Sequence, residues 1–273
     1  MRSVASGLFT VIAMVAMVIA VPSAWLSQRV VSTDGFVASA SEAAKTTEVQ
    51  DYFAQKVADS VAQATGSQIA SSLVLPAARN YSRSEGFVED FSQVARQQHD
   101  WLFNPPAPGV DLHLMELDIT PMINRVIASA PIPVPVRIQQ PVVITIDQGQ
   151  ITAGSMEDTG TLVSVAVWVS LVTAAVGSIL ALLLARRRGT VLAWLGVGAV
   201  LAGVVGAILA AFTKTIISDR LANTDAAARD TIEVVVRGVA DNLTTVSTIV
   251  GAVGAVVVVA GIIARTVGGR RVA

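Results

Sequence analysis

The chain has 273 residues, of which 53% are hydrophobic and only 14% are charged, and its formal net charge is −1. Soluble domains usually carry about 25% charged residues, so this much apolar surface has no room in a single soluble core. The absence of cysteine from the sequence excludes disulfides, zinc–thiolate sites, iron–sulfur clusters and cysteine nucleophiles.

Four uncharged runs, which begin at Val4, Thr161, Thr190 and Val246, are long enough to cross a bilayer. A helix rises about 1.5 Å per residue, so roughly 20 residues cross a hydrocarbon core of about 30 Å. Backbone groups in lipid must bond to one another, which predicts α-helices. The predicted transmembrane helices are residues 1–26, 161–185, 190–212 and 246–264.

The first apolar run has an alternative interpretation as a cleaved signal peptide, because small residues surround Pro22 near its end. The apolar core of a signal peptide is about 7–15 residues long, and this run is longer. Proline is also awkward at a cleavage site. An uncleaved membrane anchor is therefore the preferred prediction.

Arginine marks three short segments, residues 1–3, 186–189 and 265–273, which contain no acidic residue. The positive-inside rule places all three in the cytoplasm. The sequence therefore predicts a multi-pass protein of the cytoplasmic (inner) membrane with both termini cytoplasmic, a cytoplasmic turn and a cytoplasmic tail. Residues 27–160 and 213–245, which hold all 20 acidic residues, are then extracytoplasmic.

The larger outer segment predicts a mostly helical α+β extracytoplasmic domain that contains a small sheet. Apolar spacing and capping residues indicate helices over 47–66, 84–105 and 118–129. Alternation predicts a half-buried strand over 110–114, and β-branched residues predict another over 142–146. The second outer segment is predicted to be helical from Thr224, with a direct continuation into the last span left open.

The prolines at 131, 133 and 135 interrupt an apolar strip over 130–136, which is expected to be extended. One interpretation is the edge of the sheet packed on a helix, which is the preferred one. The other is a surface that rests on the bilayer or receives a lipid tail. Trp25 at the end of the first span fits an interfacial anchor.

Residues that carry chemistry are scarce. The spans contain no ionisable group, which argues against a pump, an ion channel or a secondary transporter. His99 and His113 lack the helical spacing of a metal site, so we expect ordinary histidines on polar faces. No nucleophile elbow or phosphate-binding loop occurs, and the acidic outer segment disfavours nucleic acid. The sequence therefore predicts no catalytic, cofactor-binding or metal-binding residue, and no cofactor.

Small residues recur at four-residue spacing in the last two spans, where they would let helix backbones approach closely. The favoured role is packing within the bundle, and the alternative is docking onto a helix of a partner. The helix-packing candidates are Gly198, Ala202, Gly206, Ala210, Ser247, Gly251 and Ala255.

The layout is similar to that of a group of multi-spanning integral membrane proteins from actinobacteria. The similarity rests on residues 31–37 after the first span, 48–51, the helix with His99, 114–119, the Val-Ile-Thr-Ile strand, the arginine-rich turn and 225–239. It covers nearly the whole chain and implies the envelope of a high-GC Gram-positive bacterium. The resemblance implies no activity and assigns no functional residue.

Three functions follow as hypotheses. The leading one is a non-enzymatic interaction or scaffold protein of the cell envelope, whose outer domain binds another envelope membrane protein while the spans anchor it in the lipid bilayer. The second is a lipid-binding or transport-accessory protein, suggested by the apolar strip. The third is a membrane-anchored enzyme that uses outer carboxylates, for which a polar pocket with two converging acids would be needed.

Overall fold

The computed structural model describes residues 2–65, 68–129, 141, 143–147, 151–220 and 226–269. They are mostly helical and divide into two compact units. One, here called the apolar unit, comprises Met1–Gln28, Thr161–Ile217 and Val239–Ala273. The other, here called the polar unit, comprises Arg29–Gly160 and Ser218–Gly238.

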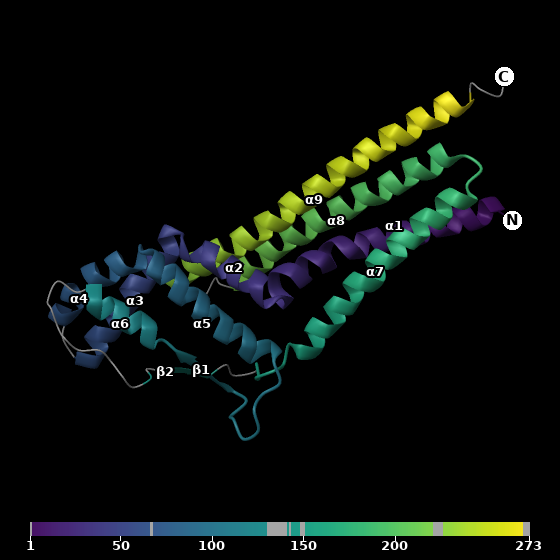
Figure 1. Cartoon of the computed structure of the whole chain (residues 1–273). Coiled ribbons are helices and arrows are strands. Elements are labelled where there is room, and N and C mark those ends of the chain that lie inside the picture. The colour runs from purple at the N-terminus through teal and green to yellow at the C-terminus, as the bar shows by residue number, and fades with distance from the viewer. Residues whose placement is uncertain are drawn as a thin grey trace. The chain divides into compact units, whose positions relative to one another are not determined.

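Four long helices build the apolar unit (Figure 1). They are α1 (Arg2–Leu26), α7 (Glu157–Leu184), α8 (Arg188–Arg220) and α9 (Ala226–Gly269). Each contains a stretch long and apolar enough to cross a membrane, with a mean hydropathy of 2.3 to 2.5. The prediction of four membrane-length helices is therefore confirmed, and the chain has the composition of a multi-pass membrane protein.

Large apolar side chains point outward from these helices, as Trp168 on α7 and Val256 on α9 illustrate. Lipid is the environment that such side chains fit.

Inside the unit, α1 and α7 are joined by the hydroxyl of Ser6, which donates to the carbonyl oxygen of Ala181 at 2.8 Å. The helix α9 is continuous for 44 residues, so the helical segment before the last span runs directly into that span.

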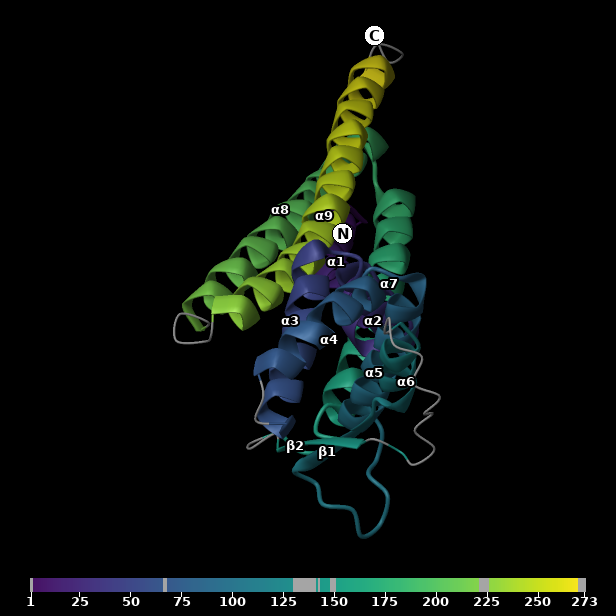
Figure 2. The ribbon, with the colours of Figure 1, turned by 90° about the vertical axis from the view of Figure 1, so that its left-hand side faces the viewer.

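Five helices and one pair of strands build most of the polar unit (Figure 2). The helices are α2 (Thr33–Ala44), α3 (Thr47–Thr65), α4 (Gln68–Ser82), α5 (Glu85–Phe103) and α6 (Thr120–Ser129). A π-helical turn, η1 (Ser27–Val31), follows α1. The strands β1 (Leu114–Asp118) and β2 (Val143–Asp147) pair antiparallel, with Glu116 opposite Thr145.

Aromatic rings fill the core of the polar unit. Phe87 is fully buried, and its ring centroid lies 4.8 Å from that of Phe53, 5.7 Å from Tyr81 and 5.6 Å from Phe91. Aliphatic side chains from α3 and α6 and two alanines from the end of α2 surround these rings. The core thus ties α2 through α6 together through apolar burial.

The predicted helices over 47–66, 84–105 and 118–129 are confirmed as α3, α5 and α6. Ser84 caps α5, because its side chain accepts a hydrogen bond from the amide of Phe87. The helices α2 and α4 were not predicted. The strip over 130–136 and the residues Thr224 and Asp225 lie outside the described residues.

The strand predicted over 110–114 is wrong, because β1 begins only at Leu114. Asp111 accepts a hydrogen bond from the amide of His113 at 2.9 Å, which turns the chain before the strand starts. The alternation of Met115 and Leu117, both buried, with the exposed Glu116 instead marks β1 as half-buried. The other predicted strand is shifted by one residue, to Val143–Asp147.

Candidate functional site

The helices α8 and α9 approach each other through residues without bulky side chains. A methyl group placed on Gly196 of α8 would lie 2.6 Å from the amide nitrogen of Val258 and 2.7 Å from the carbonyl oxygen of Gly254. One placed on Gly254 would lie 2.7 Å from the amide nitrogen of Val200. The neighbouring atoms belong to the backbone, which cannot rotate away, so only glycine permits this distance.

The contact repeats every seven residues along both helices. Gly189 of α8 lies against Gly261 of α9, Gly196 against Gly254, and Gly203 against Ser247. At the far end Ala210 and Ala240, both buried, pack together with Leu243. A seven-residue repeat keeps one seam of an α-helix facing its partner when the two helices coil around each other.

The packing candidates predicted from four-residue spacing are distributed over several environments. Gly198 faces Met14 of α1, Ala202 is fully buried, and Gly206 faces both Ser247 and Val21. Ala210 and Ser247 lie in the α8–α9 seam already described.

On α9, a methyl group placed on Gly251 would meet nothing within 4 Å, although the backbone of Gly251 borders Gly203. Ala255 is exposed. The seam residues Gly189, Gly196, Gly203, Gly254 and Gly261 were missed, and their seven-residue recurrence was the signal that would have found them.

A carboxylate in the polar unit is buried and is paired with an arginine and a tyrosine of the same unit. Asp90 of α5 accepts a hydrogen bond from the hydroxyl of Tyr81 of α4 at 2.7 Å, and its Oδ2 lies 3.0 Å from Nε of Arg125 of α6. Arg125 also donates to Glu89 at 2.9 Å. Burial, with the hydrogen bond to Asp90, raises the pKa of Tyr81 far above its ordinary value. Oδ2 of Asp90 is shared by a cation and a phenol, so this cluster holds three helices together, while Oδ1 of Asp90 is buried without a hydrogen-bond partner among the described residues.

His99 was predicted to lie on a polar face, and this is wrong because its side chain is buried. Its Nε2 lies 3.0 Å from the carbonyl oxygen of Val31, and its Nδ1 lies 3.2 Å from the hydroxyl of Thr33. The ring stacks on Phe103 with 4.5 Å between the ring centroids. Both ring nitrogens therefore have a partner within hydrogen-bond distance, and this one side chain connects the end of η1 to the start of α2.

Metal ligands do not converge in the part of the chain that the structure describes. Within it, no group of three or more histidine, aspartate or glutamate side chains is placed to hold an ion. His113 lies at the turn before β1, whereas His99 lies on α5.

Exposed large apolar side chains outside the four long helices lie in the strand pair or next to it in the sequence. Among the described residues they are Val110, Leu112, Val143 and Ile151, with exposed fractions of 51%, 43%, 44% and 41%. Val110 and Leu112 lead into β1, Val143 begins β2, and Ile151 follows β2. We call these four residues the strand-pair surface. Figures 1 and 2 show the strands, and the loop before β1, at one end of the polar unit.

Backbone hydrogen bonds hold the base of this surface. The amide of Ala153 donates to Leu112 at 2.8 Å, that of Gly154 to Trp101 at 2.9 Å, and that of Met156 to Leu102 at 3.0 Å. Gly154 has a φ of 74°, and a methyl group there would lie 3.0 Å from Cδ of Pro106. The exposed apolar residues therefore extend from a segment that is tied to the end of α5.

No family model matches the chain, and no curated protein or solved structure matches it either.

Proposed function

We propose that the protein is a non-enzymatic interaction protein of the cell envelope. In this proposal it crosses the cytoplasmic membrane four times, with both termini in the cytoplasm. The polar unit then lies on the outer side and binds another membrane or envelope protein. The strand-pair surface is the single observation that carries the proposal.

Exposed apolar side chains on a water-soluble surface normally mark a contact site when they cluster. Here Val110, Leu112 and Ile151 flank the end of the strand pair at which β1 begins and β2 ends, and Val143 lies at its other end, opposite Asp118. The large apolar side chains of the polar unit's core are buried or partly buried. Within the described residues each strand pairs only with the other, so each retains a backbone edge. Exposed edges of this kind accept a further strand from a partner.

The segment beneath the strand-pair surface is already held in place, which favours binding of a partner. Three backbone hydrogen bonds hold the segment around Gly154 to α5 and to the loop before β1. A surface that is already ordered loses less conformational entropy when it binds. The exposed Glu116 and Asp118 lie on β1 between these apolar residues, so the best partner has an apolar patch with basic residues at its rim.

The experiment is site-specific photocrosslinking in the native membrane. A benzophenone side chain replaces Leu112, and a matched one replaces Gln55, an exposed residue on α3. We expect a discrete protein adduct from position 112 and none from position 55. The substitution Val143→Asp should abolish an adduct formed from position 112.

Adducts that are identical from both positions, or adducts to lipid alone, would contradict the proposal.

The orientation has its own test in reporter fusions after Gly189 and after Asp158. We expect the first fusion to report the cytoplasm and the second the outer side, because arginine flanks the first position and acids flank the second. The reverse result would place the polar unit in the cytoplasm.

A further inference from the structure

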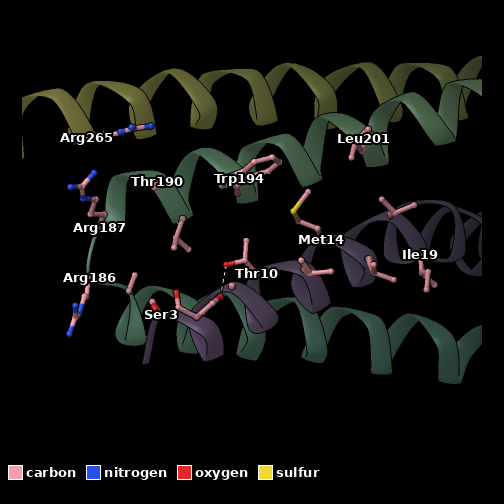
Figure 3. Close-up of a pocket in the computed structure, with 17 residues that line it drawn as sticks. Ser3, Thr10, Met14, Ile19, Arg186, Arg187, Thr190, Trp194, Leu201 and Arg265 are labelled. Carbon is pink, nitrogen blue, oxygen red and sulfur yellow. Dashed lines mark hydrogen bonds between the residues drawn. The ribbon is translucent and has the colours of Figure 1, made fainter. Parts of the chain in front are cut away.

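A groove of about 840 Å³ lies in the apolar unit between α1 and α8 (Figure 3). Its volume falls within the range of ordinary small-molecule sites, about 300–1,000 Å³. Val11, Met14, Val15 and Ile19 of α1 form one wall, and Trp194 and Leu201 of α8 lie opposite. The groove is therefore apolar along most of its length.

Hydroxyl groups on α1 do not make this wall polar, because they bond within the protein. Ser6 donates to the carbonyl oxygen of Ala181, and Thr10 donates to the carbonyl oxygen of Ser6, both at 2.8 Å. Both residues are also nearly buried. What the groove offers a ligand is aliphatic and aromatic surface.

One end of the groove is basic. Arg186, Arg187 and Arg265 line it there together with Ser3 and Thr190, and Figure 3 shows all three arginines at this end. None of the three forms an ion pair with a carboxylate among the residues that the structure describes. The sequence offers no acid nearby, because segments 1–3, 186–189 and 265–273 contain none.

The groove is long enough to hold a lipid tail. From Ser3 to Ile19 the helix α1 rises by roughly 24 Å, at about 1.5 Å per residue. Half of a hydrocarbon core of about 30 Å is about 15 Å. One acyl chain of a single leaflet therefore fits along the wall while its headgroup stays level with the arginines.

We infer that this groove binds one anionic glycerophospholipid of the surrounding bilayer. Its phosphate lies at Arg187 and Arg265, and one acyl chain lies along Val11, Val15 and Leu201. Guanidinium groups bind phosphate oxygens through charge-assisted, bidentate hydrogen bonds. The amino end of α8 adds a partial positive charge at the same place. A zwitterionic headgroup fits less well, because the amine would find no carboxylate there.

The test titrates the full-length protein, stripped of lipid in detergent, with dioleoylphosphatidylglycerol or with dioleoylphosphatidylcholine, and counts bound lipid by native mass spectrometry. We expect one tightly bound phosphatidylglycerol and clearly weaker binding of phosphatidylcholine. Arg187→Gln and Arg265→Gln should each lower the affinity for the anionic lipid about fivefold, because each basic residue contributes about 1 kcal/mol. Glycerol phosphate, which has the headgroup without chains, should not displace the lipid.

Arg188→Gln is the matched control for charge. Arg188 lies in the same turn, is exposed like Arg187, and does not line the groove. We expect the affinity of the Arg188→Gln variant for the anionic lipid to stay within about twofold of that of the unchanged protein, because Arg188 lies outside the site. Equal losses from Arg187→Gln and Arg188→Gln would overturn the inference, because general attraction by a basic membrane face would explain them.

Val15→Trp tests the apolar part without changing charge. Val15 lines the groove and is 55% exposed, and Val165 on α7 is 54% exposed but lies outside the groove. We expect Val15→Trp to abolish the one-to-one complex and Val165→Trp to preserve it. Retention of the complex by Val15→Trp, in protein that elutes as a single species, would overturn the inference. The strand-pair surface lies in the other unit, so this result is separable from the photocrosslinking result.

Discussion

The hydroxyl of Tyr81 donates a hydrogen bond to Oδ2 of Asp90 at 2.7 Å, in the interior of the polar unit. The same oxygen lies 3.0 Å from Nε of Arg125, and the Asp90 side chain is only 1% exposed. One carboxylate oxygen therefore joins α4, α5 and α6. A buried charge depends on every partner that it has, so this arrangement is sensitive to small changes.

Removing the phenol hydroxyl should destabilise the polar unit. We expect Tyr81→Phe to cost about 1–3 kcal/mol, because Asp90 loses a buried hydrogen-bond donor. The control is Tyr52→Phe, which changes the chain's other tyrosine, a partly exposed residue on α3. Hydrogen–deuterium exchange of α4 and α5 in the full-length protein measures the difference. Equal protection in the two variants would contradict the role given to the Tyr81–Asp90 bond.

The same residue makes stability depend on alkaline pH. The folded state raises the pKa of Tyr81, chiefly through burial and then through the bond to Asp90. Tyr81 in the unfolded chain loses its proton near pH 10, whereas the folded phenol keeps it. The stabilisation is therefore complete below about pH 10 and falls as pH rises above it.

Unfolding of the full-length protein in detergent, followed between about pH 9 and pH 11, measures this effect. We expect Tyr81→Phe to reduce the loss of stability over that interval and Tyr52→Phe to reduce it less. A pH dependence that is unchanged in Tyr81→Phe would assign the alkaline loss to other groups.

The base of the strand-pair surface depends on glycine at one position. Gly154 and Gly109 both have positive φ, 74° and 84°, so alanine at either is strained by about 1–2 kcal/mol. Only at Gly154 would the new methyl group also meet Pro106 and the carbonyl oxygen of Asn104. We expect Gly154→Ala to expose the amides of 153–156 to exchange and to weaken photocrosslinking from position 112. Gly109→Ala, where nothing lies within 4 Å, should leave those amides protected.

Two glycines three residues apart on α9 should respond in opposite ways. Gly254→Ala forces a methyl group against the backbone of α8, and overpacking of this kind costs about 1–3 kcal/mol. Gly251→Ala points into open space and adds helix propensity, so we expect no loss of stability. Thermal unfolding in detergent micelles compares the two variants. Equal destabilisation by both would argue against the α8–α9 seam.

Much of the fold could be predicted because its signals are local. Roughly 20 residues without a charge identify a membrane-length helix with no knowledge of tertiary contacts. Ser84 and Asp118 marked the starts of α5 and α6 through their capping chemistry. The helix α4 was missed because Pro76 lies inside it, and proline within a helical pattern normally indicates an end.

The candidate sites were harder to predict because they depend on tertiary contacts. The burial of His99 follows from where α5 meets η1 and α2, which no spacing in the sequence encodes. Val110 and Leu112 are exposed because Asp111 turns the chain, whereas their alternation alone predicts a half-buried strand. The groove combines residues of α1 with residues of α8 and with Arg265 of α9, which lie far away in the sequence, so only the structure brings them together.

The seven-residue repeat also restricts how α8 and α9 can be assembled. Glycine recurs only once in two turns, so sliding one helix by a single turn, about 5.4 Å, would bring bulkier positions into the closest contacts. The next register that restores glycine at the seam lies about 10 Å away, and it leaves one end of the seam without its partner. The two helices therefore have one complete alignment, and a pair that packs in another register has to separate before it can reach this one.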